Sequence, residues 1–230
     1  SDLNYRANID ALKRAGVTDV LSLSAVGSLK EELPPGAFVV VDQFIDRSFA
    51  RNKSFFSEGC VAHVAMADPV CSRLSAMAAD AAEAAGVETV QRGGTYLVME
   101  GPQFSTRAES QLYRQWGCSV IGMTNMPEAK LAREAELPYA SVSMVTDYDC
   151  WRTEDADVDI SDILRTMHAN TVHAHALVRN LVKAMAASPR TDSPQGIETA
   201  LEFAIITAPE KRDPALLAKL DAVAGRVLNR

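Results

Sequence analysis

Two carboxylates, Asp147 and Asp149, directly follow an apolar run in the middle part of the chain. The run 139–146 begins after Pro138 and has the length and composition of a buried strand. If strand geometry persists through Thr146, alternating side chains place both carboxylates on one face, at a strand end of the kind where α/β proteins bind ligands. Because Asp is also common where a strand turns into a loop, the spacing leaves open that Asp147 only braces a turn.

Three other apolar runs also end in polar or small residues. These ends are Ser24-Ala25, 100–104 and Met123-Thr124. The runs alternate with helix patterns, and one helix opens with the Thr106-x-x-Glu109 spacing of a capping box. Alternating strands and helices predict an α/β sheet, and four polar strand ends predict one common cleft.

Three further stretches carry local structural signals. Asp68 and Pro69 predict the N-terminus of an alanine-rich helix, because Asp caps helices and Pro suits the first helical position. Residues 42–59 mix aromatic and basic side chains and predict a long loop that carries contacts or function. Residues 213–228 predict one last helix.

The composition indicates a soluble globular protein and limits the classes of molecule that it could bind. With 230 residues and 24.8 kDa the chain can bury a large core, and we favour one domain over two small ones. Its net charge of −7 disfavours nucleic-acid binding, and its apolar runs are too short to span a membrane. The scattered cysteines predict reduced thiols in a cytoplasmic protein: Cys60, Cys71, Cys118 and Cys150. A small-molecule partner is therefore favoured.

Three separated motifs support a more specific prediction. They are residues 101–110 (GPQFSTRAES), 122–128 (GMTNMPE) and 146–151 (TDYDCW). Together, and in this order, they resemble the 5'-methylthioadenosine phosphorylase family, which belongs to the trimeric purine nucleoside phosphorylases. The resemblance implies a three-layer α/β fold with a mixed central sheet flanked by helices. It also implies cleavage of a purine nucleoside by inorganic phosphate, which is a co-substrate, with no cofactor.

Within that resemblance, the two carboxylates correspond to residues that recognise the purine. Asp147 looks like the catalytic residue that hydrogen-bonds N7 and supports its protonation as the base departs. Asp149 would accept a hydrogen bond from the 6-amino group, directly or through water. Phe104 resembles an aromatic wall against purine and ribose, although it could also be a core residue. Related inosine- and guanosine-specific enzymes carry Asn and Glu at the positions of Asp147 and Ser105, so an acid with Ser105 opposite implies adenine.

The ribose and phosphate parts of the site also have counterparts. Met123 and Thr124 resemble the segment along the ribose, with Thr124 also reaching phosphate. Ser24 and the backbone N–H of Ala25 resemble another part of the phosphate site. Without the resemblance, Ser24 would be a plain strand hydroxyl.

Three residues correspond to the pocket for the 5' substituent. His63 matches a histidine that reaches the neighbouring subunit's 5' pocket, and the resemblance accordingly implies a homotrimer. Ile160 and Ile163, one helical turn apart, would contact the methylthio group. Without the resemblance, the histidine would be structural and the two isoleucines would be core residues.

The match weakens at both ends of the chain. The family begins with a further strand, a phosphate-contacting loop and an Arg-His pair, none of which precedes Asn4 here. We therefore expect residues 1–230 to form a single phosphorylase domain that lacks these elements and binds phosphate incompletely on its own. Residues 188–196 are rich in Pro, Ser and Gly and predict an exposed linker to the C-terminal helices.

Several alternatives stay open. The nearest is a phosphorylase of methylthioinosine or other 6-oxopurine nucleosides, which Asp147 and Ser105 argue against. A hydrolytic nucleosidase would release adenine without phosphate, and a non-catalytic nucleoside-binding module would bind without turnover. The acids could instead hold magnesium. His168 and His175 share a helix face, but no acid stands at metal-ligand spacing, so the sequence predicts no metal site.

Overall fold

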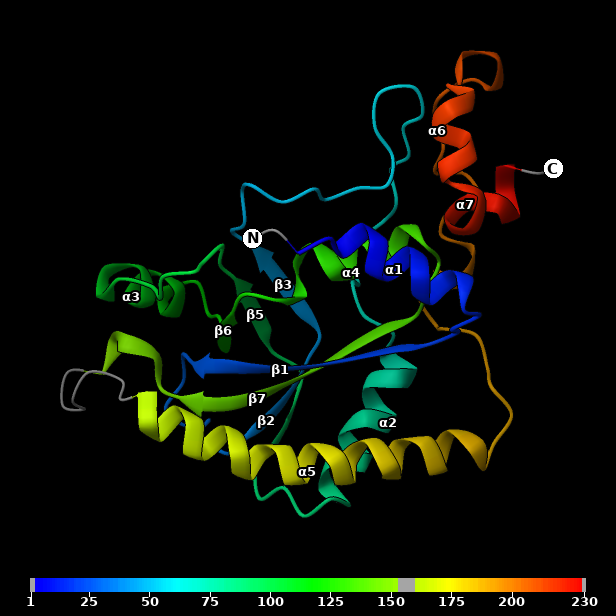
Figure 1. Cartoon of the computed structure of the whole chain (residues 1–230). Coiled ribbons are helices and arrows are strands. Elements are labelled where there is room, and N and C mark those ends of the chain that lie inside the picture. The colour runs from blue at the N-terminus through cyan, green and yellow to red at the C-terminus, as the bar shows by residue number, and fades with distance from the viewer. Residues whose placement is uncertain (1–2, 153–159, 229–230) are drawn as a thin grey trace.

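A mixed seven-stranded sheet forms the centre of the molecule (Figure 1). The computed structural model describes residues 3–152 and 160–228. The strands follow the order β3-β5-β6-β1-β7-β2-β4 across the sheet. Their bounds are β1 Val20–Ser28, β2 Phe38–Val41, β3 Gln43–Asp46, β4 Val90–Arg92, β5 Thr95–Val98, β6 Val120–Gly122 and β7 Tyr139–Asp147.

Helices cover both faces of this sheet, which confirms the predicted three-layer fold class. Helices α1 and α4 pack together on one face, and α2 and α5 pack together on the other (Figure 1). In the described part of the chain the helices are α1 Tyr5–Arg14, α2 Ser72–Glu83, α3 Arg107–Gln115, α4 Asn125–Glu134, α5 Ile160–Ala186, α6 Pro214–Lys219 and α7 Asp221–Leu228. Helix α7 packs against α1, so the end of the chain returns to its beginning.

Strand β2 shows how the sheet separates two apolar cores. Val39 and Val41 pack in the core on the α1 and α4 side, whereas Phe38 and Val40 pack in the core on the α2 and α5 side. All four side chains are buried. A strand buried on both faces is apolar throughout, which is why this segment has no polar alternation in the sequence.

Strand β1 changes neighbours near its end. It runs parallel to β7 for most of its length, but its last residues, Gly27 and Ser28, pair antiparallel with β6. A register shift between Val26 and Gly27 marks this change. The ends of β1, β6 and β7 therefore meet although β6 runs against β1. These strand ends form the predicted cleft, although the sheet that brings them together is mixed and not purely parallel.

Three predicted elements were wrong in detail. Residues 43–46 form β3 instead of part of a long loop, because this short edge strand pairs in parallel with β5. Helix α2 begins at Ser72, with Cys71 at the N-cap, and not near Pro69. The predicted last helix is two helices, α6 and α7, which meet at the buried Leu220. The capping box at the start of α3 is confirmed.

Segment 188–196 is exposed at several positions, but hydrogen bonds of several of its residues hold it in place. Arg190 donates hydrogen bonds to Asp19 and Glu198. Ser193 is buried, and its hydroxyl donates to Glu198 at 2.6 Å. The chain between α5 and the C-terminal helices is thus fastened to the body of the protein.

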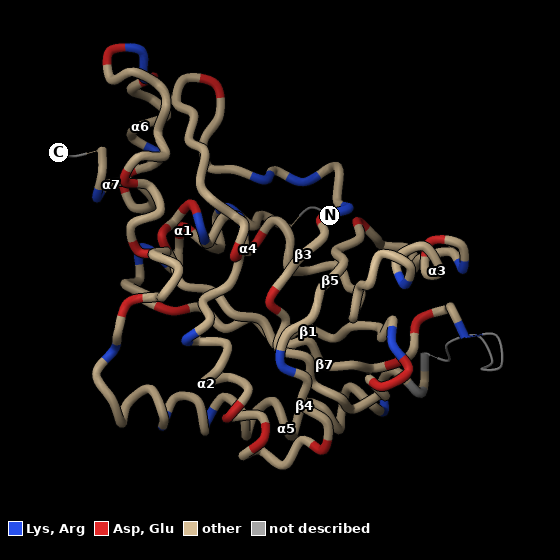
Figure 2. Tube along the Cα trace, turned by 180° about the vertical axis from the view of Figure 1, so that it is seen from behind, with Lys and Arg blue, Asp and Glu red and all other residues tan. Residues whose placement is uncertain are grey.

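Charged residues of both signs are interspersed along the chain, with a basic run on the segment that follows β3 (Figure 2). Two members of that run are paired, Arg51 with Glu100 and Lys53 with Asp46. Much of the basic charge there is therefore engaged inside the molecule. Among the described residues, no helix combines the length and apolar character needed to cross a membrane.

Candidate active site

A cavity of about 300 Å³ lies where the ends of β1, β5, β6 and β7 approach the first turns of α5. Mostly apolar walls with a few polar groups are typical of small-molecule sites. The described residues that line it are Ala25, Val26, Gly27, Met99, Phe104, Ile121, Gly122, Met123, Thr124, Thr146, Asp147, Asp149, Ile163 and Met167. Helix α5 is held over this cavity by buried Asn170, whose side chain donates to the Val145 carbonyl at 3.0 Å.

The structure brings most of the predicted site residues onto this lining. They are Ala25, Phe104, Met123, Thr124, Asp147, Asp149 and Ile163. Ser24 and Ser105 lie behind it, each hydrogen-bonded to a neighbour described below. Ile160 begins α5, but its side chain lies outside the described residues. His63 is not among the described residues that line the cavity.

Asp147 is the last residue of β7, and hydrogen bonds hold its carboxylate from two sides. The Thr146 hydroxyl donates to Oδ2 at 2.7 Å, and the backbone N–H of Asp149 donates to Oδ1 at 2.8 Å. The second bond closes a turn of the kind that Asp side chains favour. Asp147 therefore braces the turn and also lines the cavity.

Asp149 lies beyond the end of β7, so a turn and not the alternation of strand side chains directs it toward the cavity. It begins a short 3-10 turn, Asp149–Trp151, and has a φ of 50°. A non-glycine residue in this conformation is uncommon and needs support from its surroundings. The bond from its N–H to Asp147 supplies part of that support. The two acids thus converge through a turn, which the strand pattern did not predict.

Two serine hydroxyls hold the Asp149 carboxylate. Ser105 donates to Oδ2 at 3.1 Å and Ser110 donates to the same oxygen at 2.5 Å. Burial raises the pKa of Asp149, and the hydroxyls of Ser110 and Ser105 lower it in part. Because a carboxylate has about four acceptor positions, Asp149 still has capacity for a ligand's donor.

The two serines beside Asp149 differ in how far the sequence pointed to them. Ser105 was expected in the site, and its hydrogen bond to Asp149 adds a contact that the sequence did not predict. Ser110 had no predicted role, although it lies in the recognised 101–110 motif. The capping box at Thr106 starts α3 and turns Ser110, one helical turn later, toward the interior, where it is fully buried.

Phe104 forms an open wall of the cavity. Phe104 is 69% exposed. It is therefore not a core residue, which was the alternative interpretation of the sequence. It follows the Glu100 loop, whose carboxylate accepts from the backbone N–H of Phe49 at 2.7 Å. A ligand stacked on this ring would cover apolar surface that now faces water.

Two glycines of the cavity lining, Gly27 and Gly122, lie where neighbouring side chains come close. A Cβ on Gly27 would lie 3.1 Å from Asp147 Oδ1 and 3.2 Å from Asp149 Cβ. A Cβ on Gly122 would lie 2.1 Å from the hydroxyl of the buried Tyr96. Neither glycine was singled out for this reason from the sequence, since the neighbours that crowd them come from distant segments.

The hydroxyls of Ser24 and Thr124 share one partner. Both donate to Oδ1 of Asn125 at 3.3 Å, so residues a hundred positions apart meet at a single amide. Asn125 is fully buried and lies in the recognised 122–128 motif, but no role was predicted for it.

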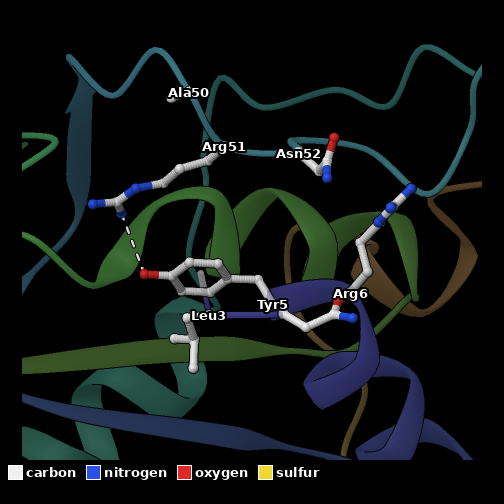
Figure 3. Close-up of a pocket in the computed structure, with 7 residues that line it drawn as sticks. Leu3, Tyr5, Arg6, Ala50, Arg51 and Asn52 are labelled. Atoms are coloured by element: carbon white, nitrogen blue, oxygen red, sulfur yellow. Dashed lines mark hydrogen bonds between the residues drawn. The ribbon is translucent and has the colours of Figure 1, made fainter. Parts of the chain in front are cut away.

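A buried arginine ties together the loops that carry Met99 and Met123. The Arg51 guanidinium donates to the carbonyls of Met123 at 2.6 Å and Glu100 at 2.8 Å, and pairs with the Glu100 carboxylate at 3.3 Å. Figure 3 shows it reaching from the loop after β3 toward the Tyr5 hydroxyl, beside a second cavity of about 340 Å³. The sequence marked Arg51 only as part of an aromatic and basic loop.

His63 lies on the segment between β3 and α2. It is exposed, and its backbone N–H donates to the Ala204 carbonyl at 2.9 Å. In residues 3–152 and 160–228, no group of three or more His, Cys, Asp or Glu side chains is arranged to hold a metal ion.

The mixed sheet and the cavity at its strand ends can be compared with known protein families. A family model described as the phosphorylase superfamily matches residues 2–183. The match includes all four strand ends around the cavity and both acids.

Individual relatives narrow this class. The S-methyl-5'-thioadenosine phosphorylase of Cereibacter sphaeroides is 66% identical over 97% of this chain and 77% of its own length. The enzyme of the same name from Bradyrhizobium diazoefficiens is 62% identical over 99% of this chain and 78% of its own length. The chain belongs to the S-methyl-5'-thioadenosine phosphorylase family of this superfamily.

Solved structures agree with this assignment. A methylthioadenosine phosphorylase from an Antarctic soil metagenomic library superposes with a TM-score of 0.89 at 42% identity, over 97% of this chain and 77% of that one. The methylthioadenosine phosphorylase of Schistosoma mansoni in complex with adenine gives a TM-score of 0.82 at 33% identity, over 88% of this chain and 78% of that one.

Proposed function

We propose that this protein is a pentosyltransferase that cleaves 5'-methylthioadenosine with inorganic phosphate, releasing adenine and 5-methylthioribose 1-phosphate. The supporting relatives are named for this activity, and one of the solved structures holds adenine. The observation that carries the proposal is the pair of acids, Asp147 and Asp149, on one side of a cavity that also carries the Thr124 hydroxyl. Such a cavity can hold a nucleoside between a purine-binding end and a phosphate-binding end.

The acids would act on the leaving base. As the bond between C1' and N9 breaks, negative charge develops on the purine, and a proton shared between Asp147 and N7 disperses it. Asp149, fixed by Ser105 and Ser110, would accept from the 6-amino group of adenine. A 6-oxo group has no proton to donate there, so this arrangement favours 6-aminopurines.

The phosphate would attack from the other end of the cavity. One phosphate oxygen forms the new bond to C1' while the electron pair of the broken bond leaves with adenine. Ser24, the backbone N–H of Ala25 and Thr124 would hold the phosphate, and Met123 would lie along the ribose. No metal or organic cofactor enters this scheme, because protonation of the base and placement of phosphate supply the chemistry.

Apolar residues would receive the methylthio group. Ile163 and Met167 line the cavity from α5, one turn apart. Ile160 would extend this surface. Met167 was not predicted for this role, although its spacing from Ile163 is the i, i+4 relation that places residues on one helix face.

Assembly and location are further parts of the proposal. We place the protein in the cytoplasm as a homotrimer in which His63 reaches the 5' pocket of a neighbour. Exposed aromatic rings support an interface near the cavity, since Phe104 is 69% and Phe49 is 82% exposed. Light scattering would measure the mass of the particle, and a monomer at working concentration would contradict this part.

Substrate comparison tests the function. Adenine release from methylthioadenosine, adenosine and inosine is measured with and without phosphate. We expect phosphate-dependent release that is fastest with methylthioadenosine and slowest with inosine. Release without phosphate would indicate a hydrolase, and binding of methylthioadenosine without release would indicate a non-catalytic module.

A further inference from the structure

One face of α5 carries a stripe of side chains that begins at the cavity and continues into the core. The spacing along this stripe alternates between four and three residues, which keeps its members on one side of a helix. We call it the inner stripe, and it consists of Ile163, Met167, Asn170, Ala174, Leu177 and Leu181. From Asn170 onward every member is buried, whereas the first two line the cavity. The inner stripe therefore connects the core to the site.

Asn170 is the polar member of the inner stripe, and it is only 2% exposed. Its side-chain nitrogen donates to the Val145 carbonyl of β7 at 3.0 Å. The same carbonyl accepts from the backbone N–H of Gly36 at 2.9 Å, so β7 does not need Asn170 to satisfy this group. A buried polar residue on an otherwise apolar helix face can instead fix the register of the helix against its partner.

Helix α5 runs in the direction opposite to β7, so the start of α5 lies beside the end of β7 (Figure 1). A second contact supports the same alignment. The ring of His173 lies edge-on to Phe38 with 6.3 Å between the ring centroids, and Phe38 pairs with Met144 of β7. Moving three residues along the helix from Asn170 thus corresponds to moving one residue back along the strand.

The same alignment brings the start of the inner stripe to the level of Asp147. This aspartate lies two residues after Val145, which is about 7 Å at the rise of a strand. Met167 and Ile163 lie three and seven residues before Asn170, which is about 4.5 and 10.5 Å at the rise of a helix. The two apolar side chains therefore lie on either side of the level of Asp147, at a depth that the bond from Asn170 to β7 determines.

We infer that Asn170 is a positioning residue, which fixes the register of α5 on β7 and so sets the depth at which the site distinguishes a 5'-methylthio group from a 5'-hydroxyl group. The inference rests on the proposed function, which places the methylthio group against Ile163 and Met167. A slip of one residue would move these side chains by about 1.5 Å along the helix axis and turn them by about 100°. The methylthio group would then lose apolar contacts, whereas the smaller and polar hydroxyl group has few to lose.

Turnover of two nucleosides tests the inference. The measured quantity is kcat/KM for methylthioadenosine divided by kcat/KM for adenosine, both with phosphate, in the wild type and in Asn170→Leu. Leucine has a similar volume but cannot donate to the Val145 carbonyl, which keeps its bond from Gly36. We expect the ratio to fall about tenfold, mainly through a higher KM for methylthioadenosine with kcat changed less. A loss that is equal for both nucleosides, or a wild type that does not prefer methylthioadenosine, would overturn the inference.

Two variants on the same helix separate register from stability. Asn180→Leu removes a hydrogen bond from α5 to the Ala81 carbonyl at 3.4 Å, about three helical turns further along. Leu181→Ala removes buried apolar surface from the inner stripe but keeps the bond of Asn170. Both variants should keep the wild-type ratio, even where Leu181→Ala lowers the melting temperature. A fall in either control that equals the fall in Asn170→Leu would overturn the inference, because the ratio would then follow the stability of the helix.

A second replacement of Asn170 covers the case in which Asn170→Leu does not fold. Asn170→Ala also lacks the donor and brings no bulk against β7. The ratio should fall in this variant as well, and an unchanged ratio in it would overturn the inference.

Binding separates this inference from the proposed function. Calorimetry with methylthioadenosine and with adenosine gives the two affinities. Phosphate-dependent release of adenine with a ratio that Asn170→Leu leaves unchanged would remove the inference and leave the function. A binding preference for methylthioadenosine that Asn170→Leu removes, without release of adenine, would remove the function and leave the inference. Absence of binding of both nucleosides would overturn both.

Discussion

The two ends of the cavity are built in different ways. At the end that we propose for the purine, the polar groups are Asp147 and Asp149, and a turn with serine hydroxyls holds them. At the end that we propose for phosphate, the polar groups are neutral hydroxyls, and a buried amide contacts them. The turn that carries the two acids is local in sequence, although its serines come from the segment around the start of α3, whereas the second end joins β1, the start of α4 and β7.

This difference reflects what each end would bind. A departing purine needs a proton and an acceptor, which acids supply. A phosphate is already negative, so a carboxylate beside it would repel it, and neutral groups with fixed orientation are better suited.

Removing Asp147 should break the purine end most completely. Asp147→Ala is expected to lower kcat/KM for methylthioadenosine by about 10²–10⁴-fold, because it removes the carboxylate that we propose to share a proton with N7. Circular dichroism should show an intact fold. Near-normal turnover in the folded variant would refute the assignment.

Arg51 holds together the two loops that carry the lining residues Met99 and Met123. Arg51→Met should lower the free energy of unfolding by about 3–5 kcal/mol, since it removes the cation from the buried Glu100 carboxylate and from several carbonyls. Urea unfolding measures this loss. Arg92→Met is the matched control, because Arg92 forms its ion pairs on the surface and its loss should change little. Similar losses in both variants would contradict the anchoring role.

The two glycines of the cavity lining differ in how much space surrounds them. Gly122→Ala should destabilise the fold by about 1–3 kcal/mol, because the new methyl group would collide with the buried Tyr96 hydroxyl. Gly27→Ala should cost less stability, since its contacts are longer, but should raise the KM for nucleoside by crowding Asp147. Thermal unfolding and kinetics distinguish the two. The reverse order of stabilities would show that the Gly27 side is the tighter one.

Replacing Asp149 should give the smallest effect and a characteristic pH dependence. Asp149→Asn should lower kcat/KM for methylthioadenosine about tenfold and affect inosine less. Burial raises the pKa of Asp149, so its charged form opposes folding above that pKa. The variant should therefore be more stable than the wild type at pH 7, and the gain should shrink at pH 4 as Asp149 gains its proton. A stability difference independent of pH would contradict this explanation.

Sequence reasoning succeeded where a signal is local. The apolar runs that end at Asp147 and Met123 mark strands by composition, and the Thr106 to Glu109 spacing marks the start of α3. It failed where a neighbour is distant. β3 is a strand because β5 lies beside it, and the N-cap position of α2 falls on Cys71 instead of Asp68.

At the site the same division holds. Asp147 and Asp149 were found because they end an apolar run, and the motif resemblance supplied the other predicted residues. Ser110, Asn125 and Arg51 were missed, although the first two lie within recognised motifs. Their importance depends on partners that only the folded chain brings near, namely Asp149, Ser24 and Glu100.

The sequence by itself therefore determined the strand that carries the two acids, the class of sheet and the family to which the motifs belong, because each is written in neighbouring residues. Tertiary structure decided how the acids converge, since a turn closed by Asp147 brings Asp149 into the cavity. It also decided that the hydroxyls of Ser24 and Thr124 meet at the buried Asn125, whose amide in turn contacts Tyr139. This network exists only when three separate segments of the chain come together.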